Sequence, residues 1–103
     1  MTPEGGVKAK VRALFRELEI HYVHVPGSAY GKGGAPDYIA CVKGLYMEVE
    51  CKDDKGKQTM LQKHQEDKCV KSGGMYVLVN NKGFQEFKEF LIKINHIGDS
   101  NEV

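Results

Sequence analysis

The sequence has no tryptophan, only three cysteines and three prolines, and no long apolar run. A membrane-spanning helix needs about 20 consecutive apolar residues, and no stretch of this chain approaches that length. The start of the chain also lacks the basic and apolar segments of a signal peptide. We therefore expect a soluble protein with no membrane partner, located in the cytoplasm.

The cysteines are too widely spaced to suggest a structural zinc site. Cys41, Cys51 and Cys69 form no CxxC pair, and the chain contains no HxxxH pair. They are better explained as small hydrophobic residues buried in a reducing compartment.

Charge of one sign is not in excess either. The chain has 15 basic and 14 acidic residues, a net charge of +1, which argues neither for nor against a nucleic-acid partner. Near the N-terminus, however, Lys8, Arg12 and Arg16 recur at helical spacing and would share one helix face. These side chains are candidate contacts to DNA phosphates, and the alternative is an ordinary solvated face.

A length of 103 residues with 41% hydrophobic content predicts one domain with a single core. We place this domain at residues 1–97 and expect a flexible tail at 98–103. Thr2 and Pro3 suit the start of a first helix, and Thr59 with Gln62 has the spacing of a capping box. After the first helix we expect strands at 20–25, 37–42 and 45–52, a helix at 59–72, a strand at 75–79 and a helix from 84 onward. This order predicts an α/β fold in which helices pack on a mixed sheet.

Two carboxylates and a lysine are predicted to meet on one face of this sheet. If Lys43-Gly44 is a two-residue hairpin loop, Asp37 lies opposite Glu50, and the two side chains point to the same face. The strand period of two puts Lys52 on that face as well. The other face then carries the apolar side chains of Ala40, Val42, Leu45, Met47 and Val49, which we expect in the core.

This arrangement suits a divalent cation. Adjacent carboxylates repel each other, and Mg²⁺ typically binds one or two carboxylates while keeping several waters. A neighbouring lysine can orient a water for attack on a phosphodiester. The alternative is a surface ladder of ion pairs, which would contribute little. Glu48 shares the face, but the spacing to Lys52 favours Glu50 as the ligand.

The segments Gly34-Ala35-Pro36-Asp37 and Glu50-Cys51-Lys52 resemble the signature of PD-(D/E)xK nucleases, and more specifically of the VRR-NUC branch. The resemblance extends from about residue 3 to residue 79. It implies a restriction-endonuclease-like αβββαβ core, a mixed sheet flanked by helices, with an extra C-terminal helix. Further matching positions are Pro3-Glu4, Gly31, Gly34, Gly44, Gln62 and Gly73-Gly74.

The resemblance also implies roles for individual residues. Asp37, Glu50 and the backbone carbonyl of Cys51 would ligate Mg²⁺ or Mn²⁺, and Lys52 would position the attacking water and stabilise charge. The family usually carries an aliphatic residue in place of Cys51, but only its carbonyl is needed.

Two more residues have implied roles that compete with simpler explanations. Glu4 would face the metal through water or a second ion, although an acidic residue in a first turn also complements the helix dipole. Gln62 would brace the lysine and the site, and the same side chain can serve the capping box.

The glycine-rich segment at 27–34 is not a nucleotide-binding loop. Its glycine spacing is one residue short of the phosphate-loop pattern, and Lys32 is followed by glycine rather than serine or threonine. We therefore expect no nucleotide cofactor. Tyr30 and Lys32 in this segment are candidate contacts to DNA.

The resemblance as a whole implies a metal-dependent DNA endonuclease that leaves 5′-phosphate ends. Stand-alone copies of this length resemble phage and prophage proteins that form homodimers and resolve four-way (Holliday) junctions, so we expect branched DNA as substrate in a bacterial host cell. One alternative is a flap or nicking endonuclease in phage recombination or replication. An alternative of another class is a DNA-binding module without catalysis.

Overall fold

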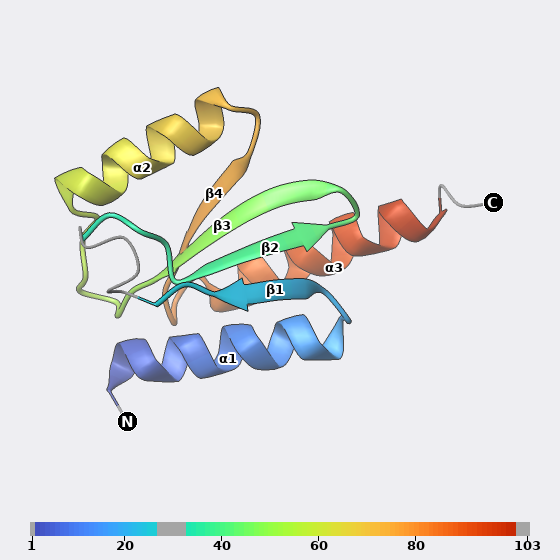
Figure 1. Cartoon of the computed structure of the whole chain (residues 1–103). Helices are drawn as coiled ribbons and strands as arrows, with labels where there is room; N and C mark the ends of the chain where they lie inside the picture. The colour runs from blue at the N-terminus through green and yellow to red at the C-terminus, as the bar shows by residue number, and fades with distance from the viewer. Residues whose placement is uncertain (1, 27–32, 101–103) are drawn as a thin grey trace.

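The computed structural model describes residues 2–26 and 33–100 of the chain (Figure 1). The elements follow the order predicted from the sequence. They are α1 (Pro3–Glu17), β1 (His21–His24), β2 (Tyr38–Val42), β3 (Leu45–Cys51), α2 (Met60–Lys71), β4 (Met75–Val79) and α3 (Phe84–Ser100). No helix in the described ranges is long and apolar enough to cross a membrane.

The four strands form one mixed sheet in the order β1-β2-β3-β4. The first three strands are antiparallel, and β4 runs parallel to β3. Tyr38 pairs with Val49 and Val42 pairs with Leu45, which is the register predicted from a two-residue hairpin loop. Lys43 and Gly44 both have positive φ, 51° and 87°, as a tight hairpin turn of the primed type requires. The predicted hairpin is therefore confirmed.

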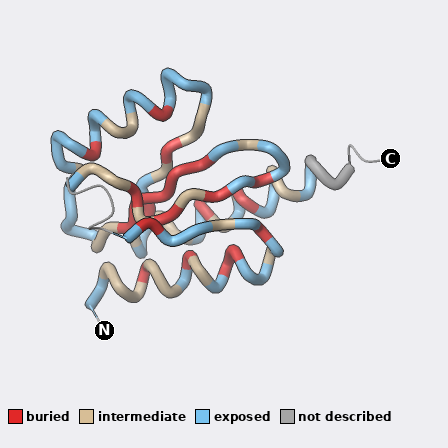
Figure 2. The backbone as a smooth tube through the Cα atoms, in the orientation of Figure 1, coloured by how far each residue is buried: buried red, intermediate tan, exposed pale blue. Residues whose placement is uncertain are grey.

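The helices lie on opposite faces of the sheet. Figure 1 shows α1 and α3 on one face and α2 on the other. The hydrophobic core fills the space between the sheet and the pair α1 and α3, and Figure 2 shows buried residues along the strands and on the inward side of α1. Phe87 and Leu91 of α3 belong to this core.

The face of the sheet under α2 is much more polar. Of the 12 residues of α2, only Gln62 and Cys69 are buried. The strands beneath present Glu48 and Glu50, which are 4% and 5% exposed. Carboxylates are rarely buried to this extent unless they are paired or functional. The surface ladder of ion pairs considered from the sequence is therefore not what the structure shows.

The predicted helix ends are confirmed. Thr2 Oγ1 accepts a hydrogen bond from the Gly5 amide at 2.9 Å, and a full capping box joins Thr59 and Gln62 at the start of α2. Each such cap contributes about 1 kcal/mol to helix stability. After α2, Gly73 takes a φ of +93°, a conformation that favours glycine.

The C-terminal boundary differs from the prediction. We expected a tail from residue 98, but α3 continues to Ser100, and only residues 101–103 of that tail lie outside the described ranges. Gly98 lies within this last part of the helix. A glycine inside a helix costs about 1 kcal/mol, which the packing of α3 on the sheet outweighs.

Candidate active site

Asp37 lies directly before β2, where the backbone fixes it on both sides. Its amide donates to the Val49 carbonyl at 3.0 Å, and its carbonyl accepts from the Val25 amide at 2.9 Å. Its side chain reaches toward the end of β3, where Oδ2 accepts a hydrogen bond from the Cys51 amide at 2.7 Å. Two neighbouring strands therefore hold this carboxylate in place.

Glu50 lies opposite Asp37 when the β2–β3 register is continued by one residue. Its Oε1 atom is buried and has no hydrogen-bond partner within the described part of the chain. Burial raises the pKa of the Glu50 carboxyl well above its ordinary value, and repulsion from Asp37 adds to this, while the Lys52 ammonium opposes it. In the absence of a cation, the site therefore disfavours the charged form of Glu50.

Lys52 follows β3 and completes the predicted group. Its Nζ lies 3.9 Å from Glu50 Oε2, and its side chain is only 15% exposed. Its amide donates to the Val79 carbonyl at 2.9 Å, which extends the pairing with β4 beyond the end of the strand. The structure thus brings Asp37, Glu50 and Lys52 together on the face predicted for them.

The carboxylates suit a cation that also takes ligands other than side chains. Within residues 2–26 and 33–100, no group of three or more His, Cys, Asp or Glu side chains is arranged to hold a metal ion. Asp37 and Glu50 would therefore need the Cys51 carbonyl and waters to complete a coordination shell. Mg²⁺ commonly binds in this way, with few carboxylates and several waters. The orphaned Oε1 of Glu50 fits such an ion, because a buried carboxylate oxygen needs a positive partner.

Lys8 belongs to the same cluster, which the sequence did not suggest. Its Nζ lies 3.4 Å from Asp37 Oδ1 and 3.5 Å from Glu4 Oε2, so it joins the two carboxylates. Burial lowers the pKa of Lys8, but the two carboxylates outweigh burial and the net pKa is raised. Lys8 lies between two acidic side chains and is partly exposed, and its contact with DNA phosphates stays a prediction. The i, i+4 spacing from Glu4 was the signal that could have indicated the ion pair with Glu4.

Glu4 and Gln62 lie in the first turns of α1 and α2. The Glu4 side chain is 41% exposed, and its charge contributes to the raised pKa of Glu50. Gln62 is buried, and its Oε1 accepts a hydrogen bond from the Thr59 amide at 2.9 Å. Gln62 therefore fixes the start of α2, and its role as a brace for the lysine stays a prediction.

The other predicted DNA contacts are in different environments. Arg12 is half-buried, and its Nη1 donates to the hydroxyl of the buried Tyr38 at 2.8 Å, while Arg16 is exposed. The stripe on α1 is therefore not a uniform solvated row. Tyr30 and Lys32 lie outside the described residues.

Glu48, the other acidic residue on this face, has different partners. It accepts hydrogen bonds from the Tyr46 hydroxyl and the Gln65 amide, at 2.6 and 2.9 Å. Repulsion from Asp37 contributes to the raised pKa of Glu50, so it is Glu50 that shares its electrostatic environment with Asp37. The geometry therefore favours Glu50 over Glu48 as the partner of Asp37.

Tyr76 on β4 is a neighbour of the site that sequence reasoning missed. It pairs with Glu48 in the parallel register, and its hydroxyl is buried without a hydrogen-bond partner among the described residues. Burial raises the pKa of this phenol, and the Glu50 charge adds to the effect. The pattern Met75–Val79 gave no sign of it, because it resembles any buried strand.

Comparison with known proteins gives one relevant similarity. No family model matches the chain, and no curated protein matches it. A solved structure described as a "VRR_NUC domain" superposes with a TM-score of 0.71 at 26% sequence identity. The match covers 86% of this chain and 97% of that one. The chain has the fold of a VRR-NUC domain.

The VRR-NUC fold accounts for the architecture described above. The resemblance predicted from the sequence is confirmed, as is the α/β restriction-endonuclease-like arrangement of a mixed sheet with flanking helices. A VRR-NUC domain indicates a nuclease of the PD-(D/E)xK type, which implies a DNA substrate. Domains of this type usually use divalent metals.

Proposed function

We propose that this chain is a metal-dependent, structure-selective DNA endonuclease, and that it acts as a homodimeric resolvase of four-way junctions. The observation that carries the proposal is the buried Glu50 carboxylate, which lies beside Asp37 and within 3.9 Å of Lys52. Burying a carboxyl whose charged form is disfavoured is costly to stability at neutral pH, so its presence points to a function.

The metal would be held by Asp37, Glu50 and the backbone carbonyl of Cys51. When bound, Mg²⁺ or Mn²⁺ supplies positive charge against a phosphodiester and makes a nearby water more acidic. Asp37 Oδ2 already accepts from the Cys51 amide, so the carboxylate and that peptide are fixed relative to each other before any ion binds. Such a fixed site loses little conformational freedom on binding an ion.

Lys52 would position the attacking water during hydrolysis. Its ammonium donates a hydrogen bond that orients the attacking water and places positive charge beside the phosphoryl oxygens. The water oxygen bonds to phosphorus and the bond from phosphorus to the 3′ oxygen breaks. The proton lost by the water ends on the departing 3′ oxygen, so the products are a 5′-phosphate and a 3′-hydroxyl.

The small size of the domain supports selection of DNA by shape. A single domain of 103 residues has little surface with which to read base sequence, so recognition of a deformed or branched structure is favoured. A four-way junction has two equivalent strands to cut. A homodimer with two symmetry-related sites can make both cuts in matched positions.

A panel of end-labelled substrates tests this proposal. The panel contains a four-way junction, a flap, plain duplex and single-stranded DNA, each incubated with Mg²⁺ or Mn²⁺, and sedimentation gives the oligomeric state. We expect paired symmetric cuts in the junction by a dimer. Cleavage of flaps or duplex in preference to the junction would leave nuclease chemistry intact and overturn the resolvase assignment. DNA binding without any cleavage would favour a non-catalytic module.

A further inference from the structure

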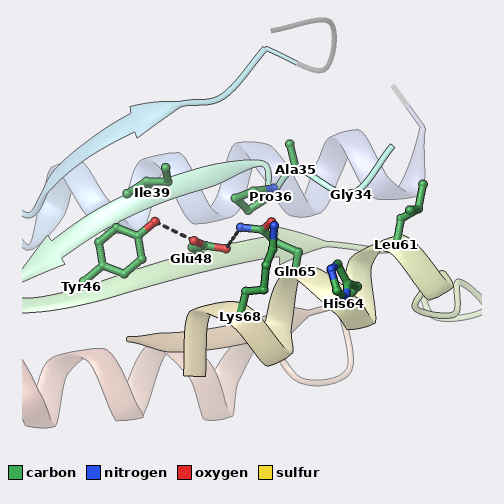
Figure 3. A pocket seen from close by; sticks show the side chains of 10 residues that line it. All are labelled: Gly34, Ala35, Pro36, Ile39, Tyr46, Glu48, Leu61, His64, Gln65 and Lys68. Carbon is green, nitrogen blue, oxygen red and sulfur yellow. Dashed lines mark hydrogen bonds between the residues drawn. The ribbon is translucent and has the colours of Figure 1, made fainter. Parts of the chain in front are cut away.

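A hollow lies on the α2 face of the sheet, lined by residues of α2 and of the strands beneath it. It has a volume of about 360 Å³, within the range of small-molecule sites. Figure 3 shows its wall of Pro36, Ile39 and Leu61, with Glu48 between the side chains of Tyr46 and Gln65. The apolar part of the wall can pack against a ring, and the carboxylate gives the pocket a strong hydrogen-bond acceptor.

Glu48 is not neutralised by a cation. Its side chain is buried, and Oε1 and Oε2 accept hydrogen bonds from the neutral amide of Gln65 and the neutral hydroxyl of Tyr46, with the Cys69 thiol as a further neighbour. None of the ion pairs between described residues includes Glu48. An ionised carboxylate has about four acceptor positions, so each oxygen can accept a further hydrogen bond from a ligand.

The pocket is lined by residues that adjoin the candidate site along the chain. Pro36 directly precedes Asp37, and Glu48 precedes Glu50 by two residues on the same face of β3. Two residues of a strand span about 7 Å. A group bound at Glu48 therefore lies within reach of a nucleotide next to a phosphodiester at Asp37 and Glu50.

We propose that this pocket holds one unpaired nucleobase, bound through N–H donors to the Glu48 carboxylate, beside the phosphodiester that is cut. This inference rests on the proposed function and gives it a physical basis for selecting branched DNA. Bases in a duplex are stacked and paired, and extracting one costs a few kcal/mol, whereas a base at a branch or flap is already free. A carboxylate accepts from base amino groups, and Tyr46 offers an aromatic neighbour.

Basic side chains at the rim of the pocket suit the negative phosphate of a nucleotide. His64 and Lys68 on α2 line its opening and are exposed. A nucleotide would thus bring its base to the acidic interior and its phosphate to the basic rim. A free anion fits the interior poorly, because Glu48 would repel it. Guanine fits best, since its N1–H and N2–H donors lie side by side and match the two carboxylate oxygens.

The test varies the single unpaired base next to the cleavage site in a branched substrate. Guanine is compared with hypoxanthine, which lacks only the amino group, and with an abasic site. For wild type in Mn²⁺ we expect guanine to be cleaved about tenfold faster than hypoxanthine, the effect of one hydrogen bond to a charged acceptor. The same order should appear in binding, measured by fluorescence anisotropy in EDTA so that no cleavage is needed.

Two variants localise the effect. Glu48→Gln removes the charged acceptor, and Ala35→Leu adds bulk to the lining of the hollow while Glu48 is kept; each should remove the preference for guanine. Glu89→Gln on the exposed side of α3 is the matched control and should keep it. Thermal melting confirms that each variant is folded.

Equal rates for the three wild-type substrates would overturn the base site alone, whereas absence of cleavage from all substrates would overturn the proposed function. A guanine preference that survives in both variants would also overturn the base site.

Discussion

The Asp37 carboxylate accepts a hydrogen bond from the backbone amide of Cys51, with 2.7 Å between Oδ2 and the nitrogen. This bond ties the residue before β2 to the last residue of β3. It orients Asp37 toward Glu50 through backbone geometry and does not depend on α2. The acidic pair is therefore a property of the hairpin itself, which is the most locally determined part of the fold.

Replacement of Asp37 by asparagine removes the charge of the side chain and keeps its shape. The amide of Asp37→Asn can still accept from the Cys51 nitrogen, so we expect the fold to be retained. The loss of one ligand charge should weaken Mn²⁺ binding by about tenfold or more. The measurement is the rise in Tm on adding Mn²⁺, which follows from binding to the native state alone. An unchanged rise in Tm would count against Asp37 as a ligand.

Glu50→Gln should stabilise the metal-free protein while it removes metal binding. The native carboxyl is buried beside Asp37, and an amide of the same size carries no charge to desolvate. We expect a gain on the order of 2 kcal/mol in the free energy of unfolding at neutral pH, measured with urea in EDTA. A variant less stable than wild type would show that the Glu50 charge is well compensated. Glu89→Gln, at an exposed position, is the control and should change little.

The same carboxyl predicts a pH dependence of the metal-free protein. The folded-state pKa of Glu50 is raised above its ordinary value of 4.5, so the folded state binds this proton more tightly than the unfolded state. Its contribution to stability is fully present below pH 4.5 and is lost as the pH rises through the folded-state pKa. Urea titrations of wild type and Glu50→Gln across this range should therefore diverge as the pH rises. Parallel curves would contradict the assignment.

Lys8→Met tests the role of the lysine that lies between Asp37 and Glu4. Lys8 holds Asp37 at 3.4 Å and competes with any metal for that carboxylate. We expect a loss of about 0.5–1 kcal/mol in metal-free stability and saturation at a lower Mn²⁺ concentration, since the competing charge is gone. Calorimetric titration with Mn²⁺ measures the affinity. Lys63→Met is the matched control, because Lys63 pairs with Glu66 and Asp67 on the exposed side of α2. Weaker Mn²⁺ binding by Lys8→Met would show that Lys8 supports the site instead.

The hairpin and the helix ends could be predicted because they depend on neighbours in the chain. A two-residue turn at Lys43-Gly44 fixes the pairing of Asp37 with Glu50, and Thr59 with Gln62 forms a cap within one helical turn. Each of these features follows from a few consecutive residues, and the structure reproduces each of them.

The remaining features depend on contacts between distant segments. The burial of Glu48 results from its contact with Gln65 on α2, and nothing near Glu48 in the sequence indicates that helix. The ion pair between Lys8 on α1 and Asp37 before β2 joins two distant segments, so the local spacing of Lys8 does not indicate it. The tail expected at 98–103 overlaps the end of α3, which continues to Ser100.

The most direct test of the account is cleavage of an end-labelled four-way junction in Mg²⁺ by wild type and Lys52→Ala side by side. Lys93→Ala, an exposed lysine on α3, serves as the control for the loss of a positive charge. We predict cleavage by wild type and by the control, abolished by EDTA, and a loss of at least 100-fold in Lys52→Ala with its fold retained. Wild-type activity in Lys52→Ala would contradict the account and place the catalytic site elsewhere.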